Sequence, residues 1–81
     1  MPIRIIIFKN NKYLDFSTIY LLCGNNFART SLWRYLRKNK KIKNFIVKSE
    51  RIYNLNDLLS DSFIVQNLMY PEILSQALEE D

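Results

Sequence analysis

The only glycine of this chain, Gly24, lies between two segments whose apolar residues recur at helical spacing. Glycine adopts positive φ without steric strain, and it is therefore common directly after the last residue of a helix. The first segment runs up to Cys23, and either Asp15 or Ser17 can cap its N-terminus. The second segment spans Ala28 to Lys38. This pattern predicts two consecutive helices joined by a short turn.

The second of these segments is strongly amphipathic. With about 100° of rotation per residue, its apolar side chains gather on one face, which consists of Ala28, Leu32, Tyr35 and Leu36. The opposite face carries Thr30, Arg34 and Arg37, while Ser31 and Lys38 lie on one flank and Trp33 on the other. Such a helix packs by its apolar face and presents arginine and hydroxyl groups outward.

Short strands are predicted on both sides of the helical pair. The segments rich in β-branched and aromatic residues are 3–8, 12–15, 45–48 and 51–53. Asn10 and Asn11 are expected to form the first turn, because asparagine tolerates left-handed backbone angles. Ser49 and Glu50 separate the second pair of strands, and either a two-residue or a four-residue loop fits there.

Two further helices are predicted in the last third of the chain. Asn56 can cap a helix that runs to about Met69, and Pro71 suits the first turn of a final helix. One face of that final helix would carry Ile73, Leu74, Ala77 and Leu78. These apolar residues can be buried by folding back onto the strand at 3–8 or by pairing with a second copy. We expect residues 62–69 to fold back and the four residues of the final helix to form a homodimer interface.

Charge is distributed very unevenly along the 81 residues. The net charge is +4, but residues 1–55 hold all twelve lysines and arginines with only two acids, a net charge of +10. Residues 56–81 hold six acids and no base. Within residues 29–51 nine bases accompany one acid, a net charge of +8. A block this one-sided is typical of a surface that faces a polyanion.

The composition argues against most hypotheses of a small enzyme. The chain has no histidine and a single cysteine, so histidine-dependent nucleophiles, histidine-bearing zinc sites and four-cysteine zinc sites are absent. One glycine cannot form a glycine-rich phosphate loop, and we expect no cofactor, no metal and no catalytic activity. The longest stretch without charge, residues 16–28, is too short and too polar to cross a membrane. A cytoplasmic setting is expected, since a lone cysteine cannot form an intrachain disulfide.

The predicted order of elements suits a protein that binds duplex DNA. A helix with a basic outer face fits the major groove of B-DNA, where arginine, serine and threonine reach base edges. A basic hairpin beside it can place lysine or arginine on the phosphate backbone.

The stretch from Tyr13 to Asp61 resembles the winged helix-turn-helix domain of excisionases and MerR-type regulators. The matching residues are Tyr13-Leu14, Leu21-Leu22, Phe27, the run from Arg29 to Arg37, Arg51-Ile52-Tyr53 and Asp57-Leu58-Leu59. The resemblance implies an α+β fold, with a second helix in the major groove and a small basic wing on the backbone. We expect one domain over 1–81, with a strand or hairpin at 1–12, the core at 13–61 and an acidic helical extension at 62–81.

The expected function is that of a sequence-specific binder of double-stranded DNA. It would act as an excisionase-like accessory factor or a small regulator of transcription, from a phage or mobile element, and would associate with the nucleoid. The expected DNA contacts are Arg29, Thr30, Ser31, Arg34, Arg37, Lys38, Lys40, Lys41, Lys43, Lys48 and Arg51. Trp33 is expected to pack against the wing or to contact a sugar-phosphate.

Two other functions remain open at this point. The chain could be a protein-interaction module, such as a phage-encoded inhibitor of a host protein, acting through its acidic C-terminal helix or its basic face; a recombinase is another possible protein partner. It could also bind RNA, because Trp33, Tyr35 and Tyr53 lie among basic residues and could stack on bases.

Overall fold

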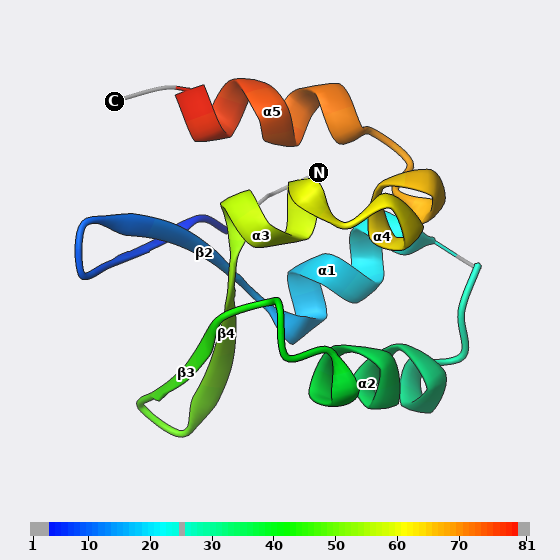
Figure 1. Ribbon diagram of the computed structural model, residues 1–81, viewed down its shortest axis with the longest axis horizontal. Coiled ribbons are helices and arrows are strands. Elements are labelled where there is room, and N and C mark those ends of the chain that lie inside the picture. Colours follow the sequence, from blue (N-terminus) through cyan, green and yellow to red (C-terminus); the bar gives the residue numbers. More distant parts are fainter. Residues whose placement is uncertain (1–3, 25, 80–81) are drawn as a thin grey trace.

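A computed structural model of the chain describes residues 4–24 and 26–79. Its elements are β1 (Ile6–Phe8), β2 (Asn11–Asp15), α1 (Phe16–Cys23), α2 (Arg29–Lys38), β3 (Asn44–Val47), β4 (Glu50–Asn54), α3 (Leu55–Ser60), α4 (Ser62–Asn67) and α5 (Pro71–Glu79). The expected α+β class is confirmed, with five helices and four antiparallel strands among the described residues (Figure 1). Predictions for Ile3, Asn25, Glu80 and Asp81 concern positions outside these ranges.

The four strands form one sheet in the order β1-β2-β4-β3, built from two hairpins. Both turns have two residues, and Lys9, Asn10, Lys48 and Ser49 all have φ between 50° and 68°. Positive φ at both turn residues matches the right-handed twist of the paired strands. The predicted turn at Asn10-Asn11 is therefore wrong by one residue. The second turn also has two residues, but it lies at Lys48-Ser49 rather than at the predicted Ser49-Glu50, since Glu50 already pairs with Val47 in the ladder.

The sheet is curled, so that its two edge strands approach each other. The ring centroids of Phe8 on β1 and Phe45 on β3 lie 5.3 Å apart, and Tyr13 on β2 lies 5.8 Å from Phe45. Side chains alternate between the two faces of a strand, and the neighbouring Leu14 belongs to the core beneath the helices. The three rings therefore form a second apolar cluster on the face that the helices leave uncovered.

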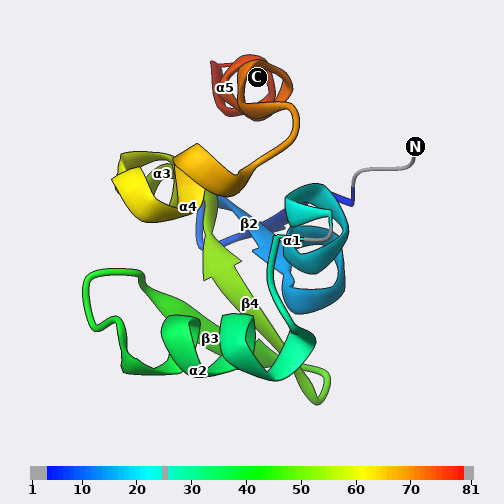
Figure 2. The ribbon, with the colours of Figure 1, turned by 90° about the vertical axis from the view of Figure 1, so that its right-hand side faces the viewer.

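The main core lies between the sheet and the helices. Its buried side chains from α1, α2 and α3 are Ile19, Leu22, Cys23, Leu32, Leu36, Leu55 and Leu58. As the helical spacing predicts, Leu32 and Leu36 are buried and carry the inner face of α2. Two perpendicular views place α2 and α5 at opposite ends of the molecule, with α1, α3 and α4 between them (Figures 1 and 2).

The ends of α1 are fixed by the side chain before it and by the glycine after it. Of the two candidate caps, Asp15 accepts a hydrogen bond from the backbone N–H of Thr18 at 2.9 Å. Gly24 follows the helix at φ 61°, as predicted, and a Cβ there would lie 2.8 Å from the Met69 sulfur. The position favours glycine by its positive φ, whereas the exposed and flexible Met69 side chain can shift to admit a Cβ.

The long helix predicted up to Met69 is instead two short helices. Asn54, rather than Asn56, caps α3 by accepting a hydrogen bond from the N–H of Asp57. Asp61 has extended backbone angles, φ −91° and ψ 111°, and separates α3 from α4. Its side chain then accepts from the first turn of α4, so the break is stabilised by a new cap.

The C-terminal extension folds back, as expected for 62–69, and it packs on helices α1 and α3. The N–H of Met69 donates to the carbonyl of Leu22 in α1 at 2.8 Å, and α5 lies along α3. Leu74 is only 1 % exposed and belongs to the main core. Ala77 and Leu78 are half-buried, and Ile73, at 43 % exposed, is the most exposed member of the expected dimer interface.

Among the described residues, no helix has both the length and the apolar character needed to cross a membrane.

Candidate nucleic-acid interface

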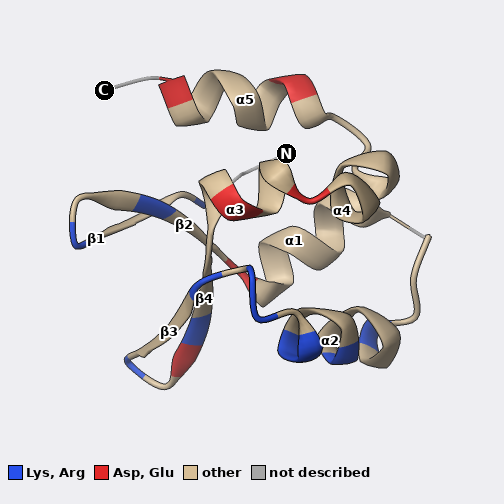
Figure 3. Ribbon diagram, viewed as in Figure 1, with Lys and Arg blue, Asp and Glu red and all other residues tan. Residues whose placement is uncertain are grey.

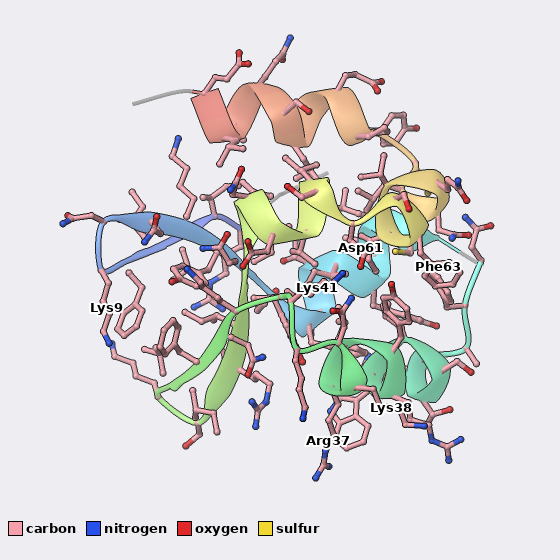
Figure 4. All side chains as sticks on the ribbon, viewed as in Figure 1. Lys9, Arg37, Lys38, Lys41, Asp61 and Phe63 are labelled. Carbon is pink, nitrogen blue, oxygen red and sulfur yellow. The ribbon has the colours of Figure 1, made fainter. Side chains whose placement is uncertain are left out.

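The residues expected to contact DNA all lie on the surface. The eleven exposed side chains are Arg29, Thr30, Ser31, Arg34, Arg37, Lys38, Lys40, Lys41, Lys43, Lys48 and Arg51. Those on α2 project from the helix while Leu32 and Leu36 anchor its other side in the core. Arg37 and Lys38 point away from the body of the molecule (Figure 4). The helix thus presents a row of arginine, lysine and hydroxyl groups to solvent.

One flank of α2 carries an alternating stripe of arginine and tryptophan. Arg29, Trp33 and Arg37 follow at intervals of four residues, so they lie one above another on the helix. The Arg37 guanidinium lies 5.0 Å from the centre of the Trp33 ring, and Trp33 remains 43 % exposed. The stripe combines positive charge with an accessible aromatic surface.

This flank of α2 faces β4 across a surface hollow of about 370 Å³, which we call the α2–β4 hollow. The lining residues are Phe16, Arg29, Thr30, Trp33, Arg51 and Tyr53. A smaller hollow of about 180 Å³ adjoins it and shares Phe16, Arg29 and Arg51. Trp33 therefore lies on the side of α2 that faces the hairpin, as expected if it packs against the wing. It does not fill the space between α2 and β4, which stays open as the hollow.

Both arginines of the α2–β4 hollow are held by neighbouring side chains. The Arg29 guanidinium lies 5.2 Å from the Phe16 ring and 5.6 Å from the Tyr20 ring, and these two rings are stacked. Arg51 donates a hydrogen bond to the side-chain oxygen of Asn44 on the adjacent strand. Sequence reasoning missed Phe16 and Tyr20 as supports, because their contact with Arg29 depends on how α1 packs beside α2.

Most of the positive charge of the described residues gathers at one end of the molecule (Figure 3). The bases of α2, of the connector after it and of the β3–β4 hairpin gather at one end, whereas α5, which carries Glu72 and Glu79, lies at the other. Asp57 of α3 and Asp61 at the α3–α4 junction lie between these ends. Arg4 engages both acids of the basic half, with its guanidinium 3.4 Å from Asp15 and 3.3 Å from Glu50. These contacts reduce the negative charge that the two acids present to an incoming polyanion.

Lys41 lies apart from the α2–β4 hollow. It lines a different hollow of about 290 Å³ together with Asp57, Asp61 and Phe63, at the junction of the α2–β3 connector with α3 and α4 (Figure 4). The backbone N–H of Lys43 donates to the Asp57 carboxylate at 3.0 Å, which fixes the connector against α3. The structure therefore brings Arg29 and Arg51 together and places Lys41 on another side.

Asp61 links α2 to the α3–α4 junction. Its carboxylate accepts hydrogen bonds from the Tyr35 hydroxyl at 2.9 Å and from the Asn39 amide at 2.6 Å, besides capping α4 through the N–H of Ile64. Burial, together with the nearby Asp61 carboxylate, raises the pKa of the Tyr35 hydroxyl above its usual value, so Tyr35 stays a donor at neutral pH. Sequence reasoning missed this contact, although an aspartate three residues before Ile64 is a recognisable cap signal.

Within the part of the chain that the structure describes, no group of three or more acidic or cysteine side chains is placed to hold a metal ion. Comparison with protein-family models, with curated proteins and with solved structures found no match. The interpretation of this surface therefore depends on its own residues and geometry.

Proposed function

We propose that this chain is a sequence-specific double-stranded DNA-binding protein of the winged helix-turn-helix type. In this proposal α2 enters the major groove, and the β3–β4 hairpin acts as the wing that contacts the phosphate backbone. The observation that carries the proposal is the outer face of α2, whose exposed arginines and hydroxyls lie beside a hairpin with Lys48 at its tip. A helix of this width and chemistry matches the major groove.

The two elements have different expected roles. Arg34 projects from the outer face of α2, at the position from which a guanidinium can donate two hydrogen bonds to a guanine edge. Lys48 lies at the hairpin turn and Arg51 at the start of β4, where they suit phosphate contacts that carry no sequence information. The protein would bind its DNA site without altering it chemically. It would act as an excisionase-like accessory factor or a small regulator of transcription.

The proposal is tested by selecting bound duplexes from a random library and then measuring variants on the selected site. Arg34→Ala should weaken binding by about 1–3 kcal/mol and relax the preference at one base pair. Lys48→Ala should weaken selected and scrambled duplexes by the same factor, because phosphate contacts are independent of sequence. Gln76→Ala, an exposed change on α5 at the opposite end of the molecule, serves as the control and should leave affinity unchanged.

A library that yields no enriched sequence would contradict sequence-specific binding. If Lys48→Ala alters the selected sequence while Arg34→Ala does not, the roles of helix and hairpin are reversed.

A protein-interaction module is the second candidate. Met69, Tyr70 and Ile73 are between 42 % and 48 % exposed near the acidic end of the molecule, where they would suit a partner with a basic and apolar surface. The same binding assay separates the two candidates, because a pure interaction module would not bind duplex DNA at low salt.

A further inference from the structure

We infer that the α2–β4 hollow binds one phosphodiester of the DNA backbone together with its deoxyribose, with Arg29 and Arg51 on the phosphate and Trp33 against the sugar. This inference depends on the proposed DNA-binding function and assigns a single backbone unit to a defined place on the interface. Three features of the hollow support it.

The first feature is that two arginines from different elements line the same hollow. Arg29 comes from the first turn of α2 and Arg51 from β4, and both line the α2–β4 hollow and the smaller hollow beside it. Two like charges that share one hollow repel each other until an anion lies between them. Guanidinium groups donate paired hydrogen bonds to phosphate oxygens in a way that a lysine cannot.

The second feature is that these arginines are already oriented. Arg29 lies over the stacked rings of Phe16 and Tyr20, and Arg51 is bonded to Asn44. Side chains that are held before binding lose less conformational entropy when the ligand arrives. Arg4 meanwhile engages the Asp15 and Glu50 carboxylates that border the smaller hollow, and so weakens their repulsion of a phosphate.

The third feature is the aromatic wall. Phe16, Trp33 and Tyr53 line the α2–β4 hollow beside the two arginines, with the Thr30 hydroxyl as a further polar group. Its volume of about 370 Å³ lies at the lower end of the range for small-molecule sites, which is roughly 300–1,000 Å³. Adjacent charged and aromatic surfaces match a sugar-phosphate unit better than they match a bare anion or an apolar ligand.

This site would fix how α2 sits in the groove. Arg29 and Trp33 lie on the same helix as Arg34, one to five residues away, so a phosphate held by Arg29 and Arg51 sets the depth and direction of α2. Backbone contacts of this kind position a recognition helix and carry no sequence information themselves.

The fluorescence of Trp33 reports on the hollow directly, because it is the only tryptophan of the chain. Titration with duplex DNA should change its emission with the same midpoint as the fluorescence anisotropy of the labelled DNA. Inorganic phosphate and a deoxynucleoside monophosphate, added at the same concentrations, should leave the emission unchanged. A change of equal size with the monophosphate alone would identify a nucleotide site and overturn the assignment to the DNA backbone.

A double-mutant cycle tests whether the two arginines share one phosphate. Arg29→Ala and Arg51→Ala should each lower affinity about tenfold, and the double variant should lose little more than either one. Each should also reduce the magnitude of the log–log salt slope by about 0.9, the value for one phosphate, and the double variant by no more. Arg29→Lys and Arg51→Lys should keep the slope while losing part of the affinity.

Thermal unfolding of each variant verifies that the fold is intact. The inference fails, while the proposed function stands, if DNA binds but Trp33 emission stays constant. It also fails if the affinity losses of the two alanine variants multiply in the double variant and the magnitude of its salt slope falls by about 1.8. If no duplex binds even at low salt, the proposed function itself fails.

Discussion

Cys23 shows how the core controls the chemistry of a single side chain. It lies at the end of α1 and is fully buried, and burial raises the pKa of its thiol to about 11. The neutral thiol is therefore favoured in the folded state at all physiological pH values. Because the folded pKa lies above that of the unfolded chain, the associated stability is present below about pH 8.5. It is lost as the pH rises toward the folded pKa.

We predict that Cys23 reacts slowly with iodoacetamide at pH 8 in the folded protein. The thiolate is the nucleophile, so both the raised pKa and the buried position suppress the reaction. Mass spectrometry should show labelling at the rate of an ordinary thiol once the protein is unfolded in urea. Equal rates in the folded and unfolded protein would contradict the buried position of Cys23.

At the scale of elements, Asp61 carries more contacts than its place between two short helices suggests. It caps α4 and accepts hydrogen bonds from Tyr35 and Asn39, which lie in or directly after α2. The ring of Phe63 packs 4.6 Å from that of Tyr35 at the same junction. The inner side of α2 is thereby tied to the C-terminal half of the chain.

We predict that Asp61→Ala lowers the free energy of unfolding by about 1–3 kcal/mol, because it removes a helix cap and leaves two donors without their acceptor. Tyr35→Phe should cost less, and urea denaturation of the double variant should reveal a coupling energy between the two residues. Ser60→Ala, next to Asp61 on an exposed position, provides the control. Strict additivity of the Asp61 and Tyr35 effects would show that their hydrogen bond contributes nothing.

Elements that are determined by residues close together in the sequence can be predicted from the sequence alone. The faces of α2 follow from its apolar spacing, and the end of α1 follows from Gly24. The break at Asp61 is concealed by Leu58, Leu59 and Phe63, which continue a helical spacing through it, although Asp61 itself carries a local cap signal. The turns at Lys9-Asn10 and Lys48-Ser49 each lie one residue before the predicted position, because neither pair carries an Asn-Gly signal.

The candidate site likewise has one part that the sequence predicts and one part that it does not. The exposed bases of α2 could be predicted from the helical wheel, since exposure there depends on one helix alone. The α2–β4 hollow could not, because Phe16 and Tyr53 reach it from elements that meet α2 only after folding.

At the scale of the whole molecule, α5 packs against the rest of its own chain. Leu74 is buried in the main core, and Lys12 of β2 donates a hydrogen bond to the carbonyl of Ala77 near the end of α5. These contacts bury Leu74 within its own chain and leave Ile73 exposed, so only part of the expected dimer face is accessible to a second copy.

We predict that Leu74→Asp unfolds the protein or lowers its melting temperature strongly, since a buried carboxylate without a partner is costly. Ile73→Asp, on the adjacent exposed position, should leave the circular dichroism spectrum and melting temperature nearly unchanged. A folded monomer from Leu74→Asp, together with a dimeric wild type, would restore α5 as the interface between copies.

The separation of charge along the molecule predicts how the protein would orient on DNA. The basic end carries α2 and the β3–β4 hairpin, and the opposite end carries α5 with Glu72 and Glu79 (Figure 3). A phosphate backbone attracts the first end and repels the second, so long-range electrostatics favour the approach in which α2 meets the groove.

The salt dependence of duplex binding tests this account most directly. Equilibrium anisotropy titrations at a series of salt concentrations give the slope of log affinity against log salt concentration, which is about −0.9 for each neutralised phosphate. Phosphate contacts from the α2–β4 hollow, from Lys48 and from the connector after α2 predict a slope of about −2.7 or steeper. Binding that is absent at low salt, or whose affinity is independent of salt, would contradict the assignment of this face to DNA.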